Sequence, residues 1–251
     1  MTVISDISEA ASPEETSGYR RLVAALSNYP VPESERLAHL SLFQHRSSLY
    51  RILFLDHLYK MILPSVGVIM EFGVRWGRDL AVLMALRSIY EPHNFSRKIV
   101  GFDTFEGFPS THEKDGNAPI VTKGALNVTE GSQDYLSDVL SAHEMLAPRS
   151  NLKKFELVRG DVSKTLPEYL KEHPETIAAM VYFDVDLYEP TAECLKVLEH
   201  HVVKGTVIAF DELVNATYPG ETRAFLECAW LRKYQPRRLP MLGYQAYIVI
   251  E

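Results

Sequence analysis

Cysteine is scarce in this sequence: only Cys194 and Cys228 occur among its 251 residues. Both lie in apolar patterns typical of helices, so no disulfide framework is indicated and we expect a reducing compartment. No apolar run approaches the length that spans a membrane, and residues 1–11 lack the basic-then-apolar pattern of a secretion signal. These absences predict a cytoplasmic protein without a membrane partner.

Long runs of positive charge are also missing. The formal net charge is −7, and cationic side chains form only short pairs such as Arg237 and Arg238. A nucleic-acid backbone requires clustered cations, so nucleic acid is not an expected partner. The length, with 46% hydrophobic and 24% charged residues, fits one globular α/β domain with a sizeable core.

The sequence is organised around residues 66–77, VGVIMEFGVRWG. The apolar run predicts a buried strand that ends in a turn, with Glu71 at its edge and Gly73 and Gly77 within it. Glycine allows the backbone to approach a ligand closely, and an apolar-rich helix is predicted over 79–90. This order is typical of a nucleotide-binding loop, and glycines also occur at plain turns.

The residues before this loop are of two kinds. Residues 1–18 are acidic and rich in Ser and Thr, which is typical of a tail or a mobile lid. Residues 36–63 carry apolar residues at helical spacing and stop at Pro64. We therefore assign 1–63 to an N-terminal tail and helical lid or cap, and 64–251 to the main domain.

Further strands are predicted along the main domain, mostly separated by helical patterns, over 97–103, 154–162, 177–186, 206–212 and 244–250. Strands that alternate with helices predict an open α/β sheet that is mostly parallel, with an antiparallel strand near one edge. The Gly- and Pro-rich start of segment 104–149 indicates an insertion that serves a site. Ligands of such sheets bind beyond the carboxyl ends of the strands.

Acidic residues follow five of the strands: Glu71, Asp103, Asp161, Asp184 with Asp186, and Asp211 with Glu212. Parallel strands would bring these side chains to one rim, where crowded carboxylates persist when they bind cations or hydroxyl groups. Alternatively, each acid caps the helix that follows. Asp184, Asp211 and Glu212 would set oxygen ligands around one point, a donor set that favours Mg²⁺, with Ca²⁺ or Mn²⁺ as alternatives.

The same loop distinguishes between nucleotide cofactors. A dinucleotide site requires G-x-G-x-x-G, which residues 73–77 lack, and Glu71 would repel a diphosphate. An acidic rim suits a cationic cofactor such as S-adenosylmethionine. Glu71 would then serve its amino-acid end, Asp103 its ribose, and Asp161 with Val162 its adenine edge. An NAD-dependent oxidoreductase is the weaker alternative.

Four segments together carry a family resemblance: 71–77 (EFGVRWG), 103–109 (DTFEGFP), 184–189 (DVDLYE) and 211–212. They resemble class I S-adenosylmethionine-dependent methyltransferases of the macrocin O-methyltransferase type, over roughly residues 64–230. The resemblance implies a Rossmann-like fold with a mostly parallel seven-stranded sheet, one antiparallel strand and helices on both faces. It implies that Mg²⁺ is held by Asp184, Asp211 and Glu212, and that the cofactor is bound by Glu71, Phe72, Gly73, Gly77, Asp103, Thr104, Asp161, Val162 and Asp184.

The sequence departs from the family pattern at two positions. Val185 replaces the usual glycine between the two aspartates, and Glu212 replaces the second aspartate of an Asp-Asp pair. These departures leave open a non-catalytic protein that binds an adenosine ligand. In the enzyme, Asp184 or Asp186 would accept the proton of the hydroxyl that is methylated.

The resemblance also predicts the acceptor. We expect a small glycosylated molecule of antibiotic biosynthesis, carrying a deoxysugar on a macrolide, aminocoumarin or enediyne. Its pocket would come from parts of 1–60 and 105–131. Apolar N-terminal helices and a tyrosine-rich edge are compatible with a homo-oligomer.

Overall fold

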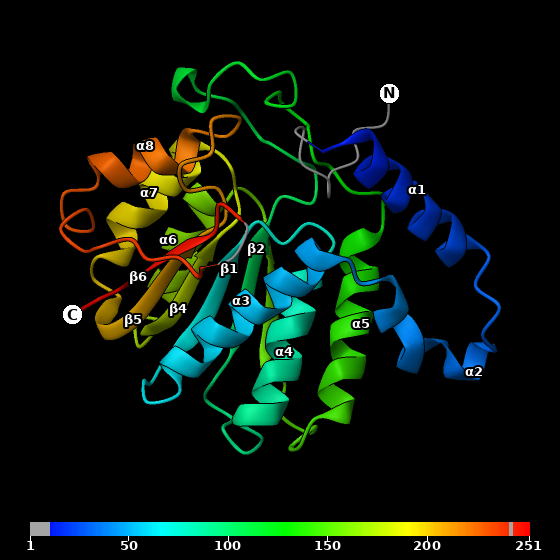
Figure 1. The fold of residues 1–251 in the computed structure, drawn as a ribbon. Helices are drawn as coiled ribbons and strands as arrows, with labels where there is room; N and C mark the ends of the chain where they lie inside the picture. The colour runs from blue at the N-terminus through cyan, green and yellow to red at the C-terminus, as the bar shows by residue number, and fades with distance from the viewer. Residues whose placement is uncertain (1–10, 241–242) are drawn as a thin grey trace. The chain divides into compact units, whose positions relative to one another are not determined.

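The computed structural model describes residues 11–240 and 243–251. The chain divides into two compact units, Met1–Leu53 and Phe54–Glu251. Helix α3 (Arg46–Ile62) contains the division, and Figure 1 shows the elements of both units. The division falls before the boundary predicted at residue 63, which stays a prediction.

The smaller unit contains α1 (Pro13–Ser27), α2 (Glu33–Arg36), the 3₁₀ helix η1 (Leu37–Phe43) and the first residues of α3. Helix α1 begins inside the segment predicted as a tail. The Ser12 hydroxyl accepts a hydrogen bond from the Glu15 amide at 3.2 Å, and the Glu15 carboxylate accepts one from the Ser12 amide at 3.0 Å. This capping box satisfies two amides that a helix start leaves without partners. Residues 1–10 of the predicted tail lie outside the described residues.

The larger unit is built on a sheet of six strands: β1 (Val68–Phe72), β2 (Ile99–Asp103), β3 (Phe155–Arg159), β4 (Ala178–Phe183), β5 (Val202–Phe210) and β6 (Ala246–Val249). Their order is β3-β2-β1-β4-β5-β6, and only the β5–β6 pair is antiparallel. This confirms the predicted mostly parallel α/β sheet with an antiparallel edge.

Helices cover both faces of this sheet, as predicted (Figure 1). They are α4 (Arg78–Tyr90), α5 (Ser132–Leu146), α6 (Val162–Glu172), α7 (Tyr188–Leu198) and α8 (Gly220–Glu227), with the short 3₁₀ helix η2 (Glu113–Asp115) in the long insertion. Helices α6, α7 and α8 pack on one face. On the other face, the Phe54 ring of α3 lies 6.3 Å from the Tyr182 ring of β4.

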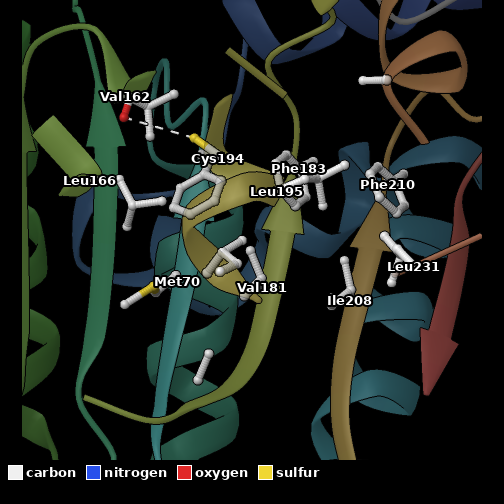
Figure 2. Packing of buried hydrophobic residues seen from close by; sticks show 14 of the residues in the cluster. Met70, Val162, Leu166, Val181, Phe183, Cys194, Leu195, Ile208, Phe210 and Leu231 are labelled. Atoms are coloured by element: carbon white, nitrogen blue, oxygen red, sulfur yellow. Dashed lines mark hydrogen bonds between the residues drawn. The ribbon is translucent and has the colours of Figure 1, made fainter. Parts of the chain in front are cut away.

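The main core lies between the sheet and helices α6 to α8, and Figure 2 shows its packing. Phe183 stacks on Phe210 of the neighbouring strand, with ring centroids 5.0 Å apart. Cys194 is buried among these side chains, and its thiol lies 3.8 Å from the Val162 carbonyl oxygen. Both cysteines are free thiols, which confirms the predicted lack of a disulfide.

The seventh strand expected from the resemblance is not confirmed, because the described residues form six. A single antiparallel bridge joins Arg237 to Tyr247 of β6, with N–H···O distances of 2.7 and 2.8 Å. Pro236 and Pro240 flank that bridge, and proline has no amide hydrogen to extend a ladder. Pairing outside β6 is therefore restricted to this bridge in the described chain. Within the same residues, no helix combines the length and the apolar character needed to cross a membrane.

Candidate active site

The turn after β1 is shaped by two glycines with left-handed backbone conformations. Gly73 has φ +91°, and a Cβ atom there would lie 1.9 Å from the carbonyl oxygen of Asp184. Gly77 has φ +80° and precedes α4. Gly73 therefore allows the backbone at the end of β1 to lie close to the backbone at the end of β4. This contact within the protein requires glycine independently of the predicted approach of a ligand.

Asp103 at the end of β2 holds this turn in place. Its carboxylate accepts hydrogen bonds from the Arg75 amide at 2.7 Å and from the Phe105 amide at 2.5 Å. Thr104 shapes the following turn, since its hydroxyl donates to the Gly107 carbonyl oxygen at 2.7 Å. Each of the two oxygens accepts one of these hydrogen bonds, and a carboxylate oxygen can accept two, so Asp103 keeps the capacity to bind ribose hydroxyls.

Asp161, which follows β3, caps helix α6. Helix capping was the alternative to ligand binding for each of the acids that follow the strands. One carboxylate oxygen accepts hydrogen bonds from the Ser163 amide at 3.0 Å and the Ser163 hydroxyl at 2.7 Å. The side chain of Val162 is buried in the main core. Only the backbone of Val162 is therefore suited to the predicted contact with adenine.

Glu71 and Phe72 lie inside the protein at the end of β1. The Phe72 ring packs edge-on against Phe102 and Phe183, with centroid distances of 5.3 and 5.0 Å. Glu71 is 1% exposed and lies on the opposite face of the sheet. The Phe72 side chain thus has a core role, and its predicted cofactor contact is restricted to its backbone.

At the end of β5, Asp211 belongs to a buried hydrogen-bond network. The same carboxylate oxygen accepts a hydrogen bond from the Tyr182 hydroxyl at 2.6 Å and from the Gln245 side-chain amide at 2.8 Å. Tyr182 comes from β4 and Gln245 directly precedes β6. Neither partner could be predicted from the sequence, because their contacts with Asp211 depend on strand register.

Glu221 of α8 joins the acidic ends of β4 and β5. One of its carboxylate oxygens accepts a hydrogen bond from the Asp186 amide at 3.2 Å, and the other accepts one from the Glu212 amide at 3.1 Å. Burial raises the pKa of Glu221 well above its ordinary value, and the charges of Asp186, Asp211 and Glu212 raise it further. Asp186, Asp211 and Glu212 thus lie near enough to Glu221 to affect its pKa, and no signal in the sequence indicated the part that Glu221 plays.

The insertion after β2 packs onto the same rim. Phe108 and Val121 of the insertion form a small apolar cluster with Leu187, which follows β4. The buried carboxylate of Asp115 accepts a hydrogen bond from the Tyr188 amide at 2.5 Å. The insertion, which is predicted to contribute to the acceptor pocket, is thus held against the segment that carries Asp186.

A metal site is not assembled by the residues described. No three His, Cys, Asp or Glu side chains among them are grouped so as to share an ion. One oxygen of Asp211 already has two donors, and Glu212 accepts a hydrogen bond from the Asn215 side chain. Binding of Mg²⁺ by Asp184, Asp211 and Glu212 therefore stays a prediction.

The family described as macrocin O-methyltransferase (TylF) matches residues 56–226. A crystal structure of CalS11, a calicheamicin methyltransferase, has 42% sequence identity and a TM-score of 0.93, covering 98% of this chain and 95% of that chain. An apo structure of CalS11, described as a TDP-rhamnose 3'-O-methyltransferase, has 41% identity and a TM-score of 0.84, covering 95% of each chain.

A more distant structure shares the fold. The O-methyltransferase NovP has 18% identity and a TM-score of 0.59, covering 79% of this chain and 78% of that chain. None of the curated proteins that were compared matches the chain.

Proposed function

The chain belongs to the macrocin O-methyltransferase family, and we propose that it transfers a methyl group from S-adenosylmethionine to a sugar hydroxyl in natural-product biosynthesis. The observation that carries this proposal is the match to CalS11 along almost the whole of both chains. The alternative of an NAD-dependent oxidoreductase disagrees with this family membership.

The proposed acceptor is a deoxysugar, either activated by a nucleotide or already attached to a macrolide, aminocoumarin or enediyne. The nucleotide-activated form is supported by the similarity to CalS11, which is described as acting on TDP-rhamnose. The insertion near 105–131 is the proposed acceptor wall in the larger unit, because Phe108, Val121 and Asp115 fix it to the rim where the acids converge.

The proposed donor site lies beyond the carboxyl ends of β1, β2 and β3. Gly73 and Gly77 supply the close turn, Asp103 and Thr104 form the ribose side, and Asp161 with the Val162 backbone forms the adenine edge. Glu71 is proposed to serve the amino-acid end of the cofactor, and Phe72 to contact the cofactor through its backbone. The bound cofactor supplies an electrophilic methyl group on a sulfonium.

Proton removal is assigned to the end of β4. Asp184 is half-buried, whereas Asp186 is 6% exposed and its amide is bonded to Glu221. The greater exposure of Asp184 supports it as the group that accepts the hydroxyl proton. The hydroxyl oxygen forms its bond to the methyl carbon as the S–CH₃ bond breaks, and alignment of these atoms supplies much of the rate. No step is assigned to Mg²⁺.

The test is a methyl-transfer assay with the purified chain, labelled S-adenosylmethionine and a panel of TDP-deoxysugars and glycosylated metabolites. We expect label in one sugar product, and we expect Asp184→Ala to lose turnover while it retains cofactor binding. Cofactor binding without transfer to any sugar would favour the non-catalytic adenosine-ligand protein. Parallel reactions with EDTA and with added Mg²⁺ test the predicted metal dependence.

A further inference from the structure

Three arginines of the larger unit differ in how their guanidinium groups are satisfied. Arg97, which is buried, donates from Nε to Glu91, from Nη1 to the Gly67 carbonyl oxygen and from Nη2 to further oxygen acceptors, at 2.6 to 3.1 Å. Arg87 is also buried and donates to Glu144 and to the Lys154 carbonyl oxygen, both at 2.8 Å. In both cases the buried guanidinium donates to a carboxylate and to backbone carbonyl oxygens.

Arg75 lies in the turn between Gly73 and Gly77 and is not satisfied in this way. Its Nε atom is buried and has no hydrogen-bond partner among the described residues. By contrast, the nearby Arg78 is paired with Asp79 at 2.9 Å. A buried donor without an acceptor destabilises the folded protein, because it gives up hydrogen bonds to water.

The backbone of Arg75 carries a second cost. Its φ is +50°, in the left-handed region that side chains other than glycine rarely adopt, and its amide is held there by Asp103. Unfavourable backbone conformations persist where surrounding structure enforces them, and they gather at ligand sites. Strain and an unused donor at the same residue indicate that Arg75 is placed for a ligand.

We propose that the guanidinium of Arg75 binds the carboxylate of the methionine part of S-adenosylmethionine. This inference rests on the proposed function. The cofactor carries two cationic groups, the sulfonium and the ammonium, which suit the acidic rim, whereas its single carboxylate requires a cation. A guanidinium presents Nε and Nη as a planar fork that matches a carboxylate with two parallel hydrogen bonds.

The test is calorimetric titration of the wild-type chain and Arg75→Met with two probes. S-adenosylhomocysteine carries the carboxylate, and 5'-methylthioadenosine has the same nucleoside without the amino acid. Loss of a charge-assisted pair should weaken S-adenosylhomocysteine binding by about 10- to 100-fold. Affinity for 5'-methylthioadenosine should change less than about twofold, which also shows that the adenosine site remains folded.

Arg78→Met is the matched control, since it removes the same charge three residues away and should leave both affinities unchanged. Arg75→Lys keeps the charge without the fork, so its affinity for S-adenosylhomocysteine should fall between those of the wild type and Arg75→Met. This variant also serves as the test if Arg75→Met does not fold, with a measurable loss for S-adenosylhomocysteine alone as the supporting result.

Two outcomes would overturn the inference. They are unchanged affinity of Arg75→Met for S-adenosylhomocysteine, or an equal loss of affinity for both probes. Failure of the wild-type chain to bind S-adenosylhomocysteine would instead contradict the proposed function.

Discussion

The two ends of the same parallel sheet use buried charge in opposite ways. Before the strands begin, Arg97 and Arg87 are enclosed by carboxylates and carbonyl oxygens, and Lys154 shares the carboxylate of Glu144. Beyond the ends of the strands, acids converge around Glu221, and Arg75 has a buried donor without an acceptor. The amino end is arranged for stability, whereas the carboxyl end accepts unfavourable electrostatics of the kind that ligand sites carry.

The largest expected loss of stability comes from a substitution at the amino end of the sheet. Arg97→Met removes every hydrogen bond of that guanidinium and leaves Glu91 buried without its cation, which should lower the free energy of unfolding by about 3 to 5 kcal/mol. Urea unfolding measures the loss, and Arg159→Met is the control because that exposed arginine pairs with an exposed glutamate. Activity per folded molecule should be unchanged, and a stability loss below about 1 kcal/mol would contradict the assigned role.

A smaller effect is expected from Gly73→Ala at the carboxyl end. The added methyl group would meet the Asp184 carbonyl oxygen, and the backbone would remain at positive φ, for a combined loss of about 2 to 3 kcal/mol of stability. Gly131→Ala separates the two causes, since Gly131 also has positive φ but has open space around it. The control should cost about 1 kcal/mol, and equal losses in thermal unfolding would argue against the close contact with Asp184.

The pH dependence of stability sharpens the comparison further. Glu221 has a pKa raised in the folded state by burial and by Asp186, Asp211 and Glu212, so the folded protein holds its proton more tightly than the unfolded chain does. That contribution is complete below the ordinary glutamate value of 4.5 and is lost as the pH rises. The wild type should therefore lose stability relative to Glu221→Gln between pH 4.5 and pH 8. Urea unfolding in EDTA at several pH values measures this difference, and a constant difference would contradict it.

The smallest expected effect is on the stability of Arg75→Met. Because the buried Nε atom of Arg75 has no hydrogen-bond partner in the described structure, replacement should lower the free energy of unfolding by less than about 0.5 kcal/mol or should increase it. Arg97→Met makes the same substitution at the other end of the sheet and therefore serves as the reference for the measured stability change. A loss of about 2 kcal/mol or more would place Arg75 with the structural arginines instead.

Most of the fold could be predicted from the sequence, because hydrophobic periodicity and glycine placement are local signals. The apolar run at 177–186 predicted β4, and parallel strands brought Asp186, Asp211 and Glu212 into one cluster. The seventh strand was not confirmed. Pro236 and Pro240 prevent a ladder only because their segment lies beside β6, and that placement could not be predicted from the sequence.

The side-chain partners at the rim could not be predicted. Tyr182 and Gln245 reach Asp211, and Glu221 reaches the Asp186 amide, only through register and helix placement. Capping by Asp161 was a stated alternative, and periodicity alone could not decide it. Neither the unsatisfied Nε of Arg75 nor its positive φ leaves a signal in the sequence, because both arise from tertiary packing.

The most direct measurement is a crystal structure of the chain bound to S-adenosylhomocysteine. We predict that the adenosine lies beyond the ends of β1 and β2 with its ribose at Asp103, and that the carboxylate lies within hydrogen-bond distance of Arg75. A ligand bound at the amino end of the sheet, or a ribose remote from Asp103, would contradict the assignment of the carboxyl end as the methyltransferase site.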